Sequence, residues 1–297
     1  MNVRDRGPLP LLALLYAASF WGFVWYPIRL LEGLGLSGLW QTLISYAAAL
    51  ALITLLRGLP LKSLTGQGRN AFWLTLASGW TNVAFVLAVI DGEVVRVLIL
   101  FYLSPLWAAL LGRWLLAEPI RPHTGFMLTL GLAGAVIMLW QPGALQTPVN
   151  RADWLALSAG VAFALTNVMT RRMQGVSDRL KTQLAWAGVV AISGLWLLVA
   201  TLPVPHVTAA AWLGALALGV LGFFFSTLAV VYAVSRMPIQ RSSVIMLFEI
   251  VVGALSAWLL AGEGMGWREW LGGTLIVGAG LIAMSYGETD GGESDGN

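Results

Sequence analysis

Ten runs of apolar residues, each close to twenty residues long, constrain this chain more than any other feature. They lie at about 9–28, 38–56, 71–90, 94–116, 123–141, 152–172, 183–202, 208–235, 240–262 and 267–286. A helix of roughly twenty apolar residues crosses the hydrocarbon core of a bilayer, which is about 30 Å thick. We therefore expect an all-α integral membrane protein with ten transmembrane helices, surrounded by a lipid bilayer.

The composition excludes several other classes of protein. Only 10% of the residues are charged, whereas an ordinary soluble domain is about a quarter charged. The chain has no cysteine, and His123 and His206 do not stand at metal-ligand spacing, so we expect no metal site and no cofactor. The net charge of +3 is small and spread over the loops, which gives no support to nucleic-acid binding.

Basic residues between the apolar runs predict the orientation. If the N-terminus is cytoplasmic, thirteen lysines and arginines fall in cytoplasmic segments, and four fall outside, namely Arg29, Arg96, Arg151 and Arg268. Cytoplasmic loops of membrane proteins carry an excess of Lys and Arg. We therefore expect both termini in the cytoplasm.

Segments of the two halves match at a nearly constant offset. At an offset of 145 residues, Arg96 pairs with Arg241, and WLLAEP pairs with WLLAGEG, which brings Glu118 opposite Glu263. Several such matches in the same order indicate an internal repeat. The predicted organisation is a first five-helix repeat over 1–140, a connecting loop over 141–151, a second five-helix repeat over 152–286 and a disordered acidic tail over 287–297.

An odd number of spans in each half makes the two repeats inverted. The second half must enter the membrane from the side opposite to the first. Two inverted repeats related by an axis in the membrane plane support alternating access to a central site, as in many secondary transporters. This is the main physical argument for a transport function.

Three long segments carry a recognisable pattern, SFWGFVWYPIR, LSPLWAALLGRWLLAEPIRPHTGFMLTLGLAGAVIML and EIVVGALSAWLLAGEGMGWREWLGGTLIVGAGLIAM. In the second segment, Pro105 precedes Glu118 by thirteen residues, and glycines follow along the next helix. This pattern resembles the drug/metabolite transporter superfamily in its duplicated ten-helix, EamA-type branch, from about residue 10 to 286. The many tryptophans and the single Glu249 resemble the aromatic amino acid exporter group. Ile250 departs from the pattern, because the family usually has proline there.

The resemblance has implications for fold, location and activity. It implies a ten-helix inverted-repeat fold, a multi-pass location in the bacterial inner membrane, and export of amino acids or related metabolites. Substrates vary widely within the superfamily, so the resemblance does not identify the substrate of this chain.

The repeat also nominates residues for a midplane cavity. It pairs Trp21 with Phe163 and Trp25 with Asn167, and all four fall near mid-membrane. We expect these side chains to contact substrate, together with Asn82, because an amide in hydrocarbon needs a partner. The alternative is that the rings fill the core or face lipid, and that the amides bond only across helices.

A gate is predicted around Pro105. Proline has no amide hydrogen and clashes with the preceding turn, so the helix bends there and could act as a hinge. Tyr102 would place a hydroxyl group beside this bend and is a further substrate-binding candidate. Arg96 and Arg241 open their spans, and we interpret both as interfacial anchors, although Arg96 could instead meet a carboxylate.

Glu249 is the one carboxylate predicted to lie deep in the membrane. An acidic group at that depth costs about 2.5–3.5 kcal/mol on insertion scales, so it should face the interior of the bundle or a wet cavity. Three roles are open. Ionised, it could receive the ammonium group of a substrate; it could carry a proton in exchange; or it could be a protonated structural group. Glu118 and Glu263 lie at loop edges and are interpreted as structural.

We therefore predict a secondary transporter, not an enzyme, that exports small amphipathic metabolites, most of all aromatic or other apolar amino acids. Alternatives are a carrier of another metabolite or of a cationic drug and, from another class, an intramembrane enzyme or a membrane scaffold. An enzyme would need a nucleophile with a base or paired carboxylates at membrane depth. Proton coupling and oligomeric state stay open.

The predicted topology can be tested with single cysteines, because the natural chain has none. In intact cells, an impermeant thiol reagent should label the Gln146→Cys chain and leave the Thr65→Cys chain unlabelled, since only residue 146 is expected outside. Labelling of the Thr65→Cys chain alone would overturn the assignment.

Overall fold

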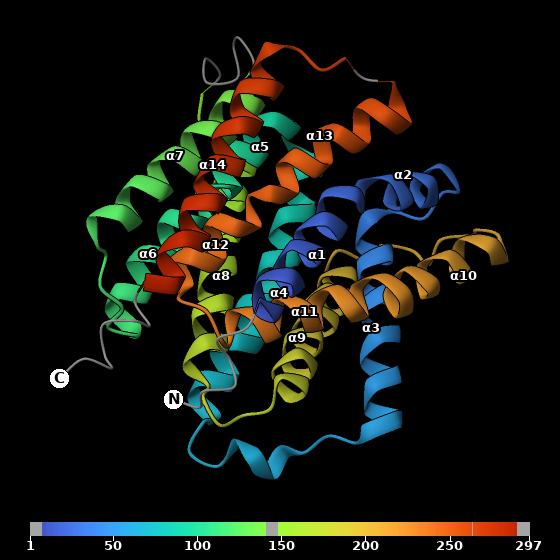
Figure 1. Ribbon diagram of the computed structural model, residues 1–297. Coiled ribbons are helices and arrows are strands. Elements are labelled where there is room, and N and C mark those ends of the chain that lie inside the picture. The colour runs from blue at the N-terminus through green and yellow to red at the C-terminus, as the bar shows by residue number, and fades with distance from the viewer. Residues whose placement is uncertain (1–7, 141–147, 263, 290–297) are drawn as a thin grey trace.

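The computed structural model describes residues 8–140, 148–262 and 264–289, which form helices and no strand (Figure 1). Nine helical spans within these ranges are long and apolar enough to cross a membrane. A further helix, α14 (Trp267–Thr289), lies at the position of the tenth predicted span. The fold is that of an all-α protein whose helices suit a multi-pass integral membrane protein.

The helices follow the predicted spans closely. The first half contains α1 (Leu9–Phe23), α2 (Trp25–Gly33), α3 (Gly38–Arg57), the short 3₁₀ helix η2 (Leu61–Leu64), α4 (Gly68–Asp91), α5 (Val94–Phe101), α6 (Ser104–Leu115) and α7 (Pro122–Leu139). The second contains α8 (Arg151–Arg172), α9 (Asp178–Val199), α10 (Ala209–Ala217), the π-helical segment η3 (Leu218–Phe223), α11 (Phe224–Val234), α12 (Ile239–Met246), α13 (Phe248–Ala261) and α14.

Two predicted boundaries shift by five residues: the first span continues through α2 to Gly33 instead of 28, and α9 begins earlier than predicted. This helix begins at Asp178, five residues before the predicted start at 183. The charged residues at its beginning argued against a membrane span, but Ser177 caps the helix by accepting a hydrogen bond from the Leu180 amide, and Lys181 is buried by neighbouring helices. Charged residues with partners in the protein can therefore belong to a spanning helix.

Other predictions fall partly or wholly outside the described residues. Helix α14 continues to residue 289, three residues into the predicted acidic tail, and the remainder of that tail, 290–297, lies outside. Most of the connecting loop, 141–147, and Glu263 also lie outside the described residues, as do Arg4 and Arg6, two of the thirteen basic residues counted as cytoplasmic.

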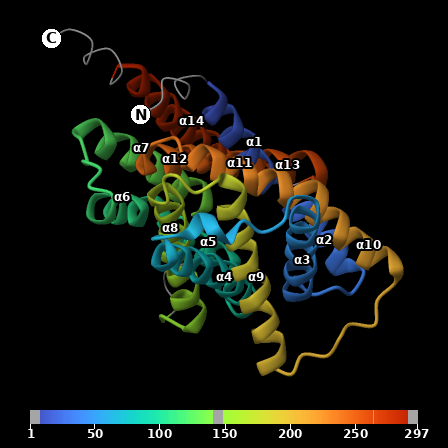
Figure 2. The ribbon, with the colours of Figure 1, turned by 90° about the horizontal axis from the view of Figure 1, so that it is seen from below.

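The main packed helix pairs join the two halves of the chain. Helix α4 lies between α8 and α9, α1 packs on α11 and α13, α7 on α14, and α5 and α6 on α8. Seen from below, α6 and α7 lie at one side of the bundle and α2, α3 and α10 at the other, with α8 between them (Figure 2). The halves are thus interleaved and share one interior.

Glycines allow several of these helices to approach very closely. A methyl group at Gly188 in α9 would overlap the carbonyl oxygen of Thr75 in α4, and one at Gly79 would overlap the Gly188 carbonyl. Gly134 of α7 and Gly272 of α14 oppose each other in the same way. Small residues at such crossings are typical of helix packing in membranes, where close backbone approach supplies the van der Waals contact.

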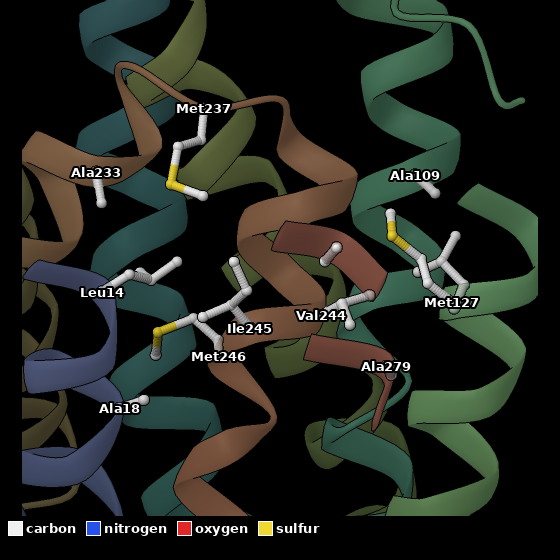
Figure 3. Close-up of a cluster of buried hydrophobic side chains, with 12 residues drawn as sticks. Leu14, Ala18, Ala109, Met127, Ala233, Met237, Val244, Ile245, Met246 and Ala279 are labelled. Carbon is white, nitrogen blue, oxygen red and sulfur yellow. The ribbon is translucent and has the colours of Figure 1, made fainter. Parts of the chain in front are cut away.

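The exterior of the bundle is apolar, as a lipid-facing surface requires. Leu55, Leu198 and Leu259 are 85%, 77% and 71% exposed. The interior contains tightly packed aliphatic side chains; Figure 3 shows one cluster, in which Met246 of α12 lies beside Leu14 of α1. Since the outside is as apolar as the inside, polar residues in the interior identify places with a special role.

The close α4–α9 crossing gives a testable prediction. Gly188→Ala should lower the free energy of unfolding by about 1–3 kcal/mol, because the added methyl group forces the backbones apart. Gly125→Ala is the matched control, since a methyl group there would have no neighbour within 4 Å, and alanine favours a helix by up to about 1 kcal/mol. Unfolding in detergent micelles, followed by tryptophan fluorescence, measures both. Equal stability of the two variants would contradict the described crossing.

Candidate functional site

Several spans break into shorter helices, as the first span does between α1 and α2 at Val24, and two of the breaks border the same pocket. One span breaks between α5 and α6 at Tyr102 and Leu103, and the other breaks between α12 and α13 at Leu247. Pro105 stands in the first turn of α6, where its missing amide hydrogen costs no helical hydrogen bond. Broken helices at membrane depth are tolerated where the backbone is buried in protein or lines a cavity.

The pocket is narrow: its free space suits about one water molecule, and part of it opens outward. Helices α6, α8, α12 and α13 and the break after α5 supply its walls. The lining residues are Tyr102, Ser104, Pro105, Ala108, Phe163, Ala164, Asn167, Ser243, Met246, Leu247 and Glu249.

Glu249 is the one charged side chain among these lining residues. It lies in the first turn of α13, where the positive end of the helix dipole favours a carboxylate. The hydroxyl group of Tyr102, at the break in the neighbouring span, donates a hydrogen bond to the Glu249 carboxylate. The two breaks are therefore joined by a polar contact directly at the pocket.

Two further polar side chains line the pocket without a protein partner. Asn167 is 7% exposed and Ser104 is 5% exposed. Neither side chain makes a hydrogen bond to another residue in the described part of the chain, which distinguishes them from Ser243, whose hydroxyl donates to the Gln240 carbonyl. Buried polar groups almost always have a partner, so water or a ligand is the expected partner here.

The remainder of the lining is apolar. The Phe163 ring packs against the ring of Phe101 at a centroid distance of 5.6 Å. Met246 lines the pocket and also belongs to the core cluster of Figure 3, so this wall is supported by the interior of the bundle. The pocket thus combines one acid, neutral hydrogen-bonding groups and an aromatic ring.

Five of the eight residues predicted for the site meet in this pocket: Tyr102, Pro105, Phe163, Asn167 and Glu249. The sequence did not single out Ser104 or Ser243. Serine is common in membrane helices, and the only available signal was the position of Ser104 directly before Pro105.

The other three predicted residues lie outside the pocket. Trp21 stacks on Phe223 with ring centroids 5.2 Å apart. Trp25 donates a hydrogen bond to the Ser256 hydroxyl, at 2.9 Å. Asn82 donates to the carbonyl of Ser78 within its own helix, at 3.1 Å.

The physical reason for this difference is that the repeat predicts the depth of a residue but not its neighbours. Trp21 lies on a face of α1 that packs against η3, and the Asn82 amide finds an acceptor one turn back along α4. Direct substrate contact by Trp21, Trp25 and Asn82 stays a prediction.

The arginine at the start of α5 has a partner within the protein. Arg96 Nε lies 2.7 Å from Asp153 Oδ1, and both side chains are 7% exposed. Asp153 also forms a capping box with Asn150 at the start of α8. Arg96 therefore joins α5 to α8 inside the protein, and an anchor at the lipid interface was too simple an interpretation.

Charged residues also connect the opposite ends of these helices. Glu118 Oε2 accepts a hydrogen bond from the Ile239 amide at the start of α12, at 2.9 Å, and Oε1 lies 3.3 Å from Arg171 Nε. Lys181, 2% exposed, donates to the Ser235 hydroxyl at 2.8 Å. The structural interpretation of Glu118 fits these contacts.

Comparisons with known proteins agree with this architecture. Residues 150–285 match the EamA-like transporter family. A solved structure described as "Crystal structure of protein" has a TM-score of 0.75, covering 94% of this chain and 98% of that chain at 20% sequence identity. At this identity the likeness shows the fold alone. No curated protein matches the chain.

The class indicated by the fold and the family match is a multi-pass membrane transporter of small metabolites. The family match supports the drug/metabolite transporter superfamily, and it covers the second of the two predicted halves.

Proposed function

We propose that the protein is a secondary transporter that exports small amphipathic metabolites through the pocket beside Glu249. The observation that carries this proposal is that one acid and two unpartnered polar side chains line a single pocket, which the breaks in two spans border. Ionisable residues inside a membrane are rare and mark substrate or ion pathways. Transporter sites are commonly built from such discontinuous helices near the midplane.

Alternating access requires two units that move relative to each other, and we propose that the two five-helix repeats supply them, with Pro105 as a hinge. The packing supports this. Each span has a counterpart at the same place in the other half, so α1 corresponds to α8 and α11 to α4. The contact of α1 with α11 then corresponds to the contact of α8 with α4, and the contact of α1 with α13 corresponds to that of α8 with α5 and α6. All of these contacts are present. The expected location is the bacterial inner membrane, with both termini cytoplasmic, in accordance with the distribution of basic residues.

Aromatic or other apolar amino acids are the cargo that the sequence predicts. Phe163 could contact an aromatic or aliphatic side chain, and Glu249 could receive the ammonium group. A carrier of another metabolite or of a cationic drug is the second candidate, which the presence of a single acid among the lining residues favours. We rank transport above an intramembrane enzyme or a scaffold because the matched family is one of transporters.

Efflux from proteoliposomes that contain the purified protein tests this proposal. Labelled phenylalanine and labelled phenethylamine are suitable cargoes, since both combine a ring with an amine. Glu249→Gln should lower the rate of export of the transported cargo by about tenfold or more, because a hydrogen bond to a charged group contributes about 1.5–3 kcal/mol. Asn167→Ala should also lower it, through loss of a neutral hydrogen bond.

The chain offers matched controls for both substitutions. Glu32→Gln alters an exposed acid of α2, and Asn70→Ala removes an amide at the start of α4 that donates to the Gln67 side chain. Both controls should transport at the rate of the unaltered protein. Wild-type export by Glu249→Gln and Asn167→Ala, with normal folding, would place the cargo site elsewhere.

A further inference from the structure

We infer that the pocket selects small primary amines with an apolar body, and that it discriminates against amino acids, whose carboxylate it does not neutralise. This inference rests on the proposed function and names its class of cargo. It starts from the charge of the site. When ionised, Glu249 supplies one negative charge, and no Lys, Arg or His is among the lining residues. A bound carboxylate would lie in the same small pocket as Glu249 and be repelled by it.

The nearest arginine along α8 has other partners. Arg171 stands one turn beyond Asn167, but its Nε faces Glu118 at 3.3 Å and its Nη1 donates to the Ser235 carbonyl at 2.9 Å. Recruiting it for a substrate would leave Glu118 without its cation. Arg241 of α12, two residues before Ser243, also has an interaction within the protein, and the buried Arg96 of α5 pairs with Asp153.

The two helix starts at the pocket, those of α6 and α13, offer little to an added anion, although amides at the start of a helix can bind carboxylates. The start of α13 already has the Glu249 carboxylate in its first turn, and its Ile250 amide donates to the Leu247 carbonyl at 3.0 Å. Helix α6 also begins at the pocket. However, Pro105 has no amide hydrogen, and the amides of Leu106 and Trp107 both donate to the Leu103 carbonyl, at 2.9 and 3.3 Å. Neutral donors, such as the Asn167 amide, could contact a carboxylate but could not balance its charge.

A primary ammonium group matches the acceptors that are present. It has three N–H donors. The pocket supplies the Glu249 carboxylate and the unpartnered oxygens of Asn167 and Ser104. Asn167 and Ser104 are buried, and Glu249 is partly buried. Phe163 and Met246 then cover an apolar body, and an aromatic face also attracts a cation. One buried acid, neutral acceptors and an apolar wall together define an amine site.

Four probes that share one phenyl ring and a two-carbon linker test this inference: phenethylamine, L-phenylalanine, 3-phenylpropanoate and phenethyl alcohol. Their binding to the full-length purified protein is measured by calorimetry in detergent, and their export is measured separately in proteoliposomes. Phenethylamine should bind at least tenfold more tightly than each of the other three. Glu249→Gln should remove this preference, and Glu32→Gln should retain it.

The outcomes separate the inference from the proposed function. Binding of phenylalanine as tightly as phenethylamine, or a phenethylamine preference that survives Glu249→Gln, overturns the amine site and leaves transport standing. The absence of phenethylamine binding also overturns it. Selective binding of phenethylamine without export of any probe supports the amine site and contradicts transport.

Discussion

A backbone amide or carbonyl group in a bilayer must find its hydrogen-bond partner within the protein, and this constraint determines where the chain can be irregular. The breaks between α5 and α6 and between α12 and α13 are possible because other helices surround them. The same enclosure lowers the contact of Glu249, Asn167 and Ser104 with lipid. The pocket therefore exists only because the bundle protects two interrupted helices, and any movement of those helices changes the pocket itself.

The interleaving of the two halves follows from the same requirement. A five-helix unit on its own would leave the polar faces of α5, α8 and α12 exposed to hydrocarbon. Packing α8 against α4, α5 and α6 brings these faces together. Glycines such as Gly188 make the approach close enough, and Arg96 with Asp153 joins α5 to α8 by an ion pair. Removing one partner of a buried pair is strongly destabilising, because it leaves an uncompensated buried charge, so this pair is a specific connection between the halves.

Much of the fold and the centre of the site could be predicted from the sequence, for a physical reason. Apolar runs match the bilayer thickness, so the spans were placed well except at two boundaries: the start of α9, where charges are neutralised within the protein, and the end of the first span, which α2 continues to Gly33. Glu249 and Asn167 stood out because polar groups are costly in hydrocarbon, and Pro105 stood out because it breaks a helix. The sequence predicted how deep Trp21 and Trp25 lie in the membrane, but not which neighbouring helices they contact. Their neighbours, Phe223 and Ser256, are more than two hundred residues away along the chain.

The central claim is that the pocket beside Glu249 binds the cargo and opens alternately to the two sides of the membrane. Reactivity of the Ser104→Cys chain with an impermeant cationic thiol reagent, added to one side of oriented proteoliposomes at a time, tests it most directly; the lipid-facing Leu55→Cys chain is the control. The account predicts that the Ser104→Cys chain reacts from both sides, that phenethylamine slows the reaction, and that the control does not react. Reaction from one side alone, at a rate that phenethylamine does not change, would contradict it.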